Sequence, residues 1–194
     1  LEDGYKVKSE TIDGLYTDTL ALSGTVQTVA RVDDVEFSSV QAAINSCIGD
    51  TAKTVTLLNT VTITESLKID SDLKVILDLN KHNIEGNFAG SIIDNSGELT
   101  IIDSSTEKTG KIINSGGQGI YNTGTLTIGT DDGTIEETVR VEGSTIGLQT
   151  TGTFNYYDGL LAATTVIDGT VNSLPSGSVI RTRTENGLTV YYID

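Results

Sequence analysis

Apolar residues recur along the middle of the chain in three separate columns. Each column is a set of short apolar stretches that return with a period near 27 residues. The columns are Leu73–Ile76, Leu99–Ile102, Leu126–Gly129 and Phe154–Tyr157; Ile84, Ile112, Val141 and Ile167; and Ile93, Tyr121 and Gln149, with Ile92, Ile120 and Leu148 beside them. Three short strands per repeat predict a parallel β-helix, whose coils stack ~4.8 Å apart. Roughly four coils fit between Val55 and Ser173.

A seven-residue phrase marks one corner of each predicted coil. It reads Asn95-Ser-Gly-Glu-Leu-Thr-Ile101, then Asn122-Thr-Gly-Thr-Leu-Thr-Ile128, and in a third, altered copy Thr150-Thr-Gly-Thr-Phe-Asn-Tyr156. Its glycines at 97, 124 and 152 are 27 and then 28 residues apart. Units this short must stack on their neighbours to bury a core, so the phrase predicts a solenoid. Asn and Gly tolerate a left-handed backbone at a sharp corner, and stacked asparagines can hydrogen-bond along the axis.

Both ends of the predicted solenoid carry a covering element. Val40, Ala43, Ile44 and Cys47 form the apolar stripe of a short helix, predicted over Ser39–Ile48, with Ser38 and Gln41 as a capping box and Gly49 as its end. An Asp-Gly or Asn-Gly pair between alternating arms predicts a β-hairpin near each terminus. We therefore divide the chain into 1–22, the tail hairpin of a preceding module; 23–36, a connector; 37–173, the helix cap and coils; and 174–194, a C-terminal hairpin.

The order of these segments resembles a known family. Phe37–Ile44, Val55–Asn59, Val61–Ile69, Val75–His82 and Gly97–Ile101 are similar to the right-handed β-helix modules, with the pectin-lyase-like fold, of large surface proteins from Gram-positive gut bacteria. The resemblance covers roughly residues 30–170 and implies an extracellular, cell-surface or cell-wall location. Lys81 departs from it, because the family usually has glycine there. The fold class predicted is thus all-β, a short right-handed parallel β-helix with an N-terminal helix cap and a C-terminal hairpin.

Composition narrows the classes of partner. The net charge is −15 and the pI is near 4.2, which argues against nucleic acid and anionic membrane surfaces and fits a secreted protein or a cation-binding one. No apolar run approaches the ~20 residues that span a bilayer. The absence of methionine suggests that the sequence is an excerpt of a longer protein. Cys47 is the only cysteine, and a buried structural thiol is the simpler interpretation.

The hypothesis of an enzymatic activity must be tested separately, because a fold does not imply a function. The polygalacturonase signatures Asn-x-Asp, Gly-His-Gly and Arg-x-Lys do not occur. Asp33-Asp34 and Asp131-Asp132 read as turns, and His82 reads as a solvated corner residue. Tyr156 and Tyr157, and likewise Tyr191 and Tyr192, alternate on predicted strands, so one of each pair is a candidate for stacking on sugars.

One set of carboxylates supports a sharper hypothesis. Counting four or five positions on from the first apolar residue of each strand in the first column gives Asp78, Asp103, Asp131 and Asp158. If the coils are in register, they stack at one strand end, where they could hold calcium, act as paired acids in glycoside hydrolysis, or simply splay into solvent. No cofactor other than this calcium is predicted. The predicted function is a non-enzymatic spacer or adhesin module, with a carbohydrate-binding or carbohydrate-cleaving domain as the alternative. Its expected partners are glycans, surface proteins and neighbouring modules.

Overall fold

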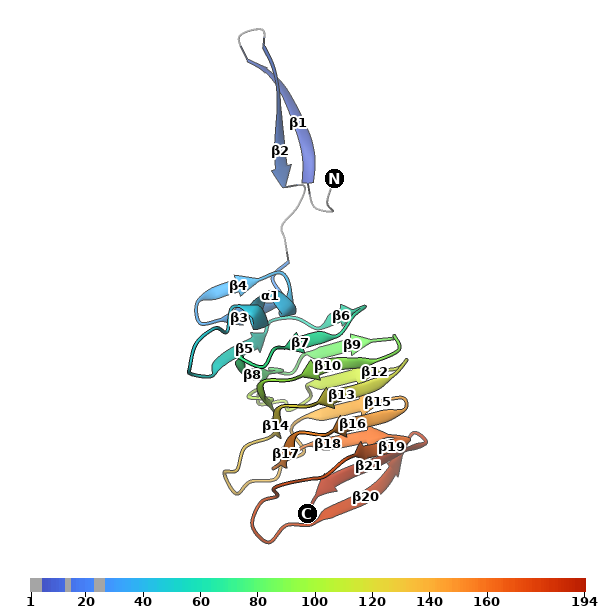
Figure 1. Cartoon of the computed structure of the whole chain (residues 1–194). Helices are drawn as coiled ribbons and strands as arrows, with labels where there is room; N and C mark the ends of the chain where they lie inside the picture. Colours follow the sequence, from blue (N-terminus) through green and yellow to red (C-terminus); the bar gives the residue numbers. More distant parts are fainter. Residues whose placement is uncertain (1–4, 13–14, 23–26) are drawn as a thin grey trace.

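The computed structural model describes residues 5–12, 15–22 and 27–194, with the side chains of residues 27–194. Figure 1 shows the chain winding into a stack of coils, each built from three strands. The coil strands pair in parallel and form three sheets, here called I, II and III in the order in which each coil visits them. The predicted all-β parallel β-helix with three strands per coil is confirmed.

Five coil strands lie in each sheet, so the chain completes four turns from β5 to β17 and most of a fifth. Sheet I contains β5 (Lys53–Leu57), β8 (Lys74–Asp78), β11 (Glu98–Ile102), β14 (Thr125–Ile128) and β17 (Thr153–Tyr156). Sheet II contains β6 (Val61–Ile63), β9 (Asn83–Gly86), β12 (Lys111–Asn114), β15 (Arg140–Gly143) and β18 (Leu160–Ala163). Sheet III contains β7 (Leu67–Ile69), β10 (Ser91–Asn95), β13 (Gln118–Asn122), β16 (Ile146–Thr150) and β19 (Thr165–Asp168).

The core is a set of straight rows of apolar side chains inside the coils. One row, on sheet I, is Val55, Leu77, Ile101, Ile128 and Tyr156, which are paired strand to strand and all buried. Phe154 lies two residues before Tyr156 and stacks on it, with ring centroids 5.6 Å apart. The strand-to-strand pairing keeps like residues in contact, so each strand buries its neighbours' apolar face as well as its own.

The register corrects three positions of the predicted columns. On sheet III, Ile93 pairs with Ile120 and not with Tyr121, because Ile120 and Asn122 both face inward and leave Tyr121 outside. On sheet II, Val141 pairs with Leu161; Ile167 instead lies on sheet III, because the fifth coil reaches β18 through a short corner. On sheet I, Leu99 pairs with Val75, so Leu73 lies before the strand. A constant period of 27 residues could not anticipate corners of unequal length.

The repeated asparagines form the predicted hydrogen-bonded row. Asn95 Nδ2 donates to Asn122 Oδ1 (2.7 Å), and Asn122 Nδ2 donates to Thr150 Oγ1 (2.9 Å). The left-handed backbone predicted for this corner is wrong, since neither the asparagines nor Gly97 and Gly124 have positive φ. Glycine is required by close packing instead: a Cβ on Gly124 would lie 2.1 Å from the carbonyl oxygen of Gly97.

The N-terminal end is covered by a strand pair and a short helix. β3 (Ala30–Val32) pairs antiparallel with both β4 (Val35–Phe37) and β5, and so covers the edge of sheet I. The helix α1 (Val40–Asn45) buries Val40, Ala43 and Ile44. It is shorter than the predicted Ser39–Ile48, and its N-cap is Ser39, whose Oγ accepts from Ala42 N (3.4 Å), so Ser38 and the capping box are wrong.

The side chain of Gln41 has a different partner from the one predicted. Its Oε1 accepts from Lys68 N (2.7 Å) and its Nε2 donates to Lys68 O (3.0 Å). The amide group therefore bonds the outer edge of β7 as another strand would, and the helix is fixed to the edge of sheet III.

A hairpin covers the other end, as predicted. β20 (Ile180–Glu185) and β21 (Leu188–Ile193) pair antiparallel, and β21 continues sheet II by pairing with β18. The segment at Asn172 and Ser173 covers β17, because Ser173 O accepts from Tyr156 N (2.9 Å).

The N-terminal segment also contains two strands. β1 (Tyr5–Ile12) and β2 (Leu15–Leu22) pair antiparallel in a sheet of their own. The residues of the predicted Asp-Gly turn, 13–14, and residues 1–4 lie outside the described part. The assignment of 1–22 to a preceding module stays a prediction. In the segment 23–36, which was predicted as a connector, β3 lies entirely and β4 begins.

Candidate functional site

Three of the four predicted aspartates are buried where sheet I turns into sheet II. Asp78, Asp103 and Asp158 are each at most 5% exposed. All three lie at or just beyond the end of a sheet I strand, so the turn that follows the strand passes over the carboxylate. Their chemistry is decided by the groups that point at them.

Asp103 has the most complete set of partners. Its Oδ1 accepts from Lys81 N (3.0 Å), Ser105 N (3.0 Å) and Ser105 Oγ (2.6 Å), and its Oδ2 accepts from Gly110 N (2.7 Å). Lys81 belongs to the preceding coil, and its φ of 67° is in the left-handed region that favours glycine. The carboxylate therefore joins two coils and holds Lys81 in a left-handed backbone conformation.

Asp78 accepts from the same two corners as Asp103, and Asp158 accepts from the corner of the preceding coil. Asp78 accepts from Asn80 N (3.0 Å), Ser104 N (2.9 Å) and Ser104 Oγ (2.6 Å). Asp158 accepts from Glu136 N (3.0 Å), Glu137 N (2.8 Å), Thr138 N (3.3 Å) and Thr138 Oγ1 (2.8 Å). When a carboxylate accepts hydrogen bonds from several backbone N–H groups, these bonds use the oxygen lone pairs that a metal or a substrate would need.

Asp131 is separate from the other three. It is exposed in the long corner between β14 and β15, beside Asp132, which accepts from Thr134 N (2.9 Å) and from the hydroxyls of Thr130 and Thr134. The hydroxyl and backbone donors of Thr134 lower the pKa of Asp132.

The four aspartates do not form one column. Ile101 is paired with Ile128, which is paired with Tyr156, so Asp103 and Asp158 occupy equivalent positions two residues further on. Asp78 is at a different position, because it is paired with Ile102. Within residues 27–194, no group of three or more His, Cys, Asp or Glu side chains is arranged to hold a metal ion. Calcium binding by the aspartates stays a prediction.

A network of ion pairs crosses sheet II at its C-terminal end. Arg140 bonds Glu142 (Nε to Oε2, 2.9 Å) and Glu185 (Nη1 to Oε2, 2.8 Å), and Arg183 bonds Glu185 (2.6 Å) and both oxygens of Glu137 (2.6 and 2.9 Å). The hydrogen bond that Arg183 donates is the main cause that lowers the pKa of Glu185, and the hydrogen bonds that Arg183 donates to Glu137 and then to Glu185 raise the pKa of Arg183. The network joins the long corner, the fourth coil and the hairpin.

Two surface hollows accompany these elements. One, of about 480 Å³, lies beside the ion-pair network and is lined by Lys81, Lys108, Lys111 and Arg140 together with Glu137. Lys81, Lys108 and Arg140 have carboxylate partners, such as Glu107 for Lys81 (3.2 Å). The other hollow, of about 440 Å³, lies between the start of α1 and β6, the outermost strand of sheet II. Neither brings the predicted aspartates together.

The two residues with intrinsic reactivity have structural surroundings. Cys47 is buried, its thiol donates to Ala43 O (3.4 Å), and burial raises its pKa. His82 is half-buried in the corner after β8, and its backbone N–H donates to Leu79 O (2.8 Å).

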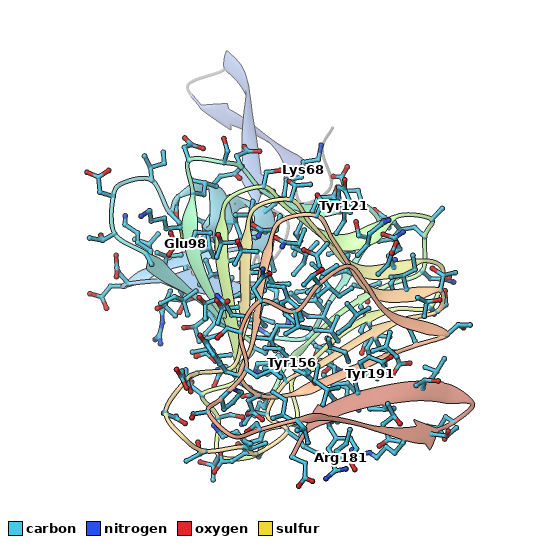
Figure 2. The ribbon with its side chains drawn as sticks, turned by 60° about the horizontal axis from the view of Figure 1, so that its bottom comes forward. Lys68, Glu98, Tyr121, Tyr156, Arg181 and Tyr191 are labelled. Atoms are coloured by element: carbon cyan, nitrogen blue, oxygen red, sulfur yellow. The ribbon has the colours of Figure 1, made fainter. Side chains whose placement is uncertain are left out.

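A surface row on sheet III was missed in the sequence. Lys68, Asp94, Tyr121, Gln149 and Asp168 are paired from strand to strand across all five strands, and their side chains are at least partly exposed. Figure 2 shows Lys68 and Tyr121 on the same side of the coils, with Tyr156 inside. The signal was the alternation in Ile120-Tyr121-Asn122: an inward asparagine in the repeated phrase requires an outward tyrosine before it.

The tyrosines that the sequence indicated as candidates for stacking on sugars have structural roles. Tyr156 is buried, and its Oη is 2.7 Å from Gly159 O and 3.0 Å from Tyr191 O. Burial is the main cause that raises its pKa well above the usual value. Tyr157 Oη donates to Ser173 Oγ (3.2 Å), and the ring of Tyr192 lies under Arg183, 4.8 Å from the guanidinium carbon.

Comparison with known proteins adds no assignment: no family model, no curated protein and no solved structure matches this chain. No helix in the described part of the chain has the length and apolar character needed to cross a bilayer.

Proposed function

We propose that this chain is a non-enzymatic, rigid module of a large secreted or cell-surface bacterial protein, where it acts as a spacer or an adhesin. The observation that carries the proposal is the use of the buried polar side chains. Asp78, Asp103, Asp158 and the row from Asn95 to Thr150 all hydrogen-bond between adjacent coils or across their corners.

These contacts support rigidity along the axis. Each coil is joined to the next by three parallel strand pairs, and polar side chains add bonds at two of the corners. Within residues 27–194, no buried side-chain nitrogen or oxygen lacks a hydrogen-bond partner. A fully satisfied polar network inside a low-dielectric core favours one register over its alternatives. A spacer needs this property, because slippage by one residue would turn every apolar row outward.

An extracellular location is part of the proposal and rests on two supports. The resemblance to β-helix modules of Gram-positive surface proteins implies it. The net charge of −15 fits a protein that stays soluble outside the cell.

The carbohydrate-cleaving alternative is less well supported by the geometry. General acids and nucleophiles must reach a substrate, and paired carboxylates act on a glycosidic bond from its two sides. Here Asp78, Asp103 and Asp158 accept from backbone N–H groups of their own corner or of the corner in an adjacent coil, and Asp131 is exposed away from these three.

The proposal is tested by pulling single molecules along the solenoid axis. Cysteine handles replace Thr51 and Thr170 in a Cys47→Ala background, so that force is applied across the coils. We expect one cooperative rupture of the coil stack. Stepwise peeling of single coils at low force would contradict a load-bearing role.

The non-enzymatic part needs a separate assay. The chain is incubated with neutral and acidic polysaccharides, and new reducing ends or unsaturated products are measured. We expect none above a heat-denatured control. Product formation that Asp131→Asn removes would show that the module is an enzyme.

A further inference from the structure

We propose that the outer face of sheet III binds a neutral oligosaccharide, with Tyr121 as the stacking platform and Asp94 and Gln149 as its flanking hydrogen-bond partners. This extends the adhesin form of the proposed function by naming a ligand class and a surface. If the chain binds no glycan, its proposed role as a spacer is unaffected, so the glycan proposal and the spacer proposal can fail separately.

The face is a straight row with one aromatic ring at its centre. Asp94 of β10 is paired with Tyr121 of β13, which is paired with Gln149 of β16, and Lys68 and Asp168 end the row. Adjacent strands are ~4.8 Å apart, so the row is about 19 Å long. That length suits an extended chain of several sugar rings.

Tyr121 is the exposed aromatic side chain of this face. It is 36% exposed and stands between two polar neighbours, whereas Ile93, Ile120 and Leu148 of the same sheet are buried inside the coils. A tyrosine ring offers an apolar surface with a polar tip, which matches a pyranose ring that has an apolar face and a rim of hydroxyls.

The polar neighbours are already held in place. Ser91 Oγ donates to Asp94 Oδ1, Gln118 Nε2 donates to Gln149 Oε1 (3.3 Å), and Gln149 Nε2 donates to Asp168 Oδ2 (3.0 Å). Side chains fixed by such contacts lose less conformational entropy when a ligand binds. Free lone pairs remain on the carboxylate and amide oxygens, so they can still accept from sugar hydroxyls.

The chemistry of the row favours a neutral glycan over other partners. A protein interface usually has a buried apolar centre, and this face offers a single ring surrounded by polar groups. Asp94 and Asp168 outnumber Lys68 in the row, and the chain carries a net charge of −15, so nucleic acids and anionic glycans are repelled.

The test is a binding screen of the full chain on an array of neutral plant, fungal and bacterial oligosaccharides, with acidic oligosaccharides beside them. We expect binding to at least one neutral class, followed by titration calorimetry with that oligosaccharide in solution. Tyr121→Ala is expected to weaken binding about tenfold or more, while Tyr121→Phe keeps the ring and most of the affinity.

Matched variants separate the row from general surface effects. Glu98→Gln alters an exposed polar side chain on sheet I and should leave affinity unchanged, whereas Gln149→Ala should weaken it. Thermal unfolding of Tyr121→Ala should match that of the parent chain. The proposal is overturned if no neutral glycan binds, if only acidic glycans bind, or if Tyr121→Ala binds as well as the parent.

Discussion

Replacing the buried Asp103 by alanine is expected to destabilise the solenoid more than replacing the exposed Asp131 by alanine. The substitution removes four accepted hydrogen bonds and leaves the backbone N–H groups of Lys81, Ser105 and Gly110 without this partner. It also removes the contact that holds Lys81 at a φ of 67°.

The magnitude follows from the kind of bond that is lost. Each hydrogen bond to a charged group contributes roughly 1.5–3 kcal/mol, and a buried donor without a partner costs about 1–3 kcal/mol. These contributions are not additive, because water can enter the corner and the turn can relax. We expect a loss of about 3–5 kcal/mol, the upper range of single substitutions. With an m-value of ~1–3 kcal/mol/M, the urea midpoint should fall by roughly 2 M.

Two further variants make the prediction specific. Asp103→Asn can keep the three bonds to Oδ1 but turns an NH₂ group toward Gly110 N, so it should lose only about 1–3 kcal/mol. Asp131→Ala, at an exposed position, should stay within about 0.5 kcal/mol of the parent.

The assay is urea denaturation followed by circular dichroism, with and without millimolar calcium. Equal losses for Asp103→Ala and Asp131→Ala would refute the reasoning. So would a calcium-dependent rise in the midpoint that Asp103→Ala abolishes, because the carboxylate would then serve a metal and not the backbone.

Three further predictions concern other parts of the fold. Gly124→Ala should cost about 1–3 kcal/mol in urea denaturation, because its Cβ would meet backbone atoms of Gly97, whereas Gly133→Ala meets no atom within 4 Å and should cost less, chiefly through its positive φ. The Cys47 thiol should react with a disulfide reagent far more slowly in the folded chain than in urea, because burial both shields it and raises its pKa; equal rates would contradict the buried position. Because the pKa of Glu185 is lowered from its ordinary value of 4.5, its contribution to stability is present above that pH and is lost as the pH falls below it, so Glu185→Gln should flatten the acid side of the stability profile.

The sequence predicted the architecture well because the architecture is repetitive. The phrase that contains Asn95 and Asn122 recurs in consecutive coils, and a row of like residues is the direct result of stacking such units. The helix with its apolar stripe from Val40 to Ile44 and the hairpin around Asn186-Gly187 could also be predicted, because each depends on residues that are close in sequence.

The candidate site could not be predicted in the same way. Whether Asp103 faces solvent, metal or backbone depends on Lys81 and Gly110, which lie in corners of different coils. Tyr121 was placed among apolar residues because it was aligned with Ile93, and only the strand pairing shows that it is aligned with Asp94. Side-chain direction at such positions depends on a register of single residues, which a hydrophobic period does not resolve.

The aspartate corners also bear on how such a protein can change. The segments 79–82, 103–110 and 129–139, which connect sheet I to sheet II, differ in length, yet aspartates at the ends of sheet I strands accept hydrogen bonds from the backbone of all three. An aspartate at this position can thus hold loops of different lengths by accepting hydrogen bonds from their backbone. Insertions can accumulate along this single flank while the coil stack stays unchanged. A foreign peptide loop grafted between Gly129 and Glu136 should therefore be displayed without loss of the fold.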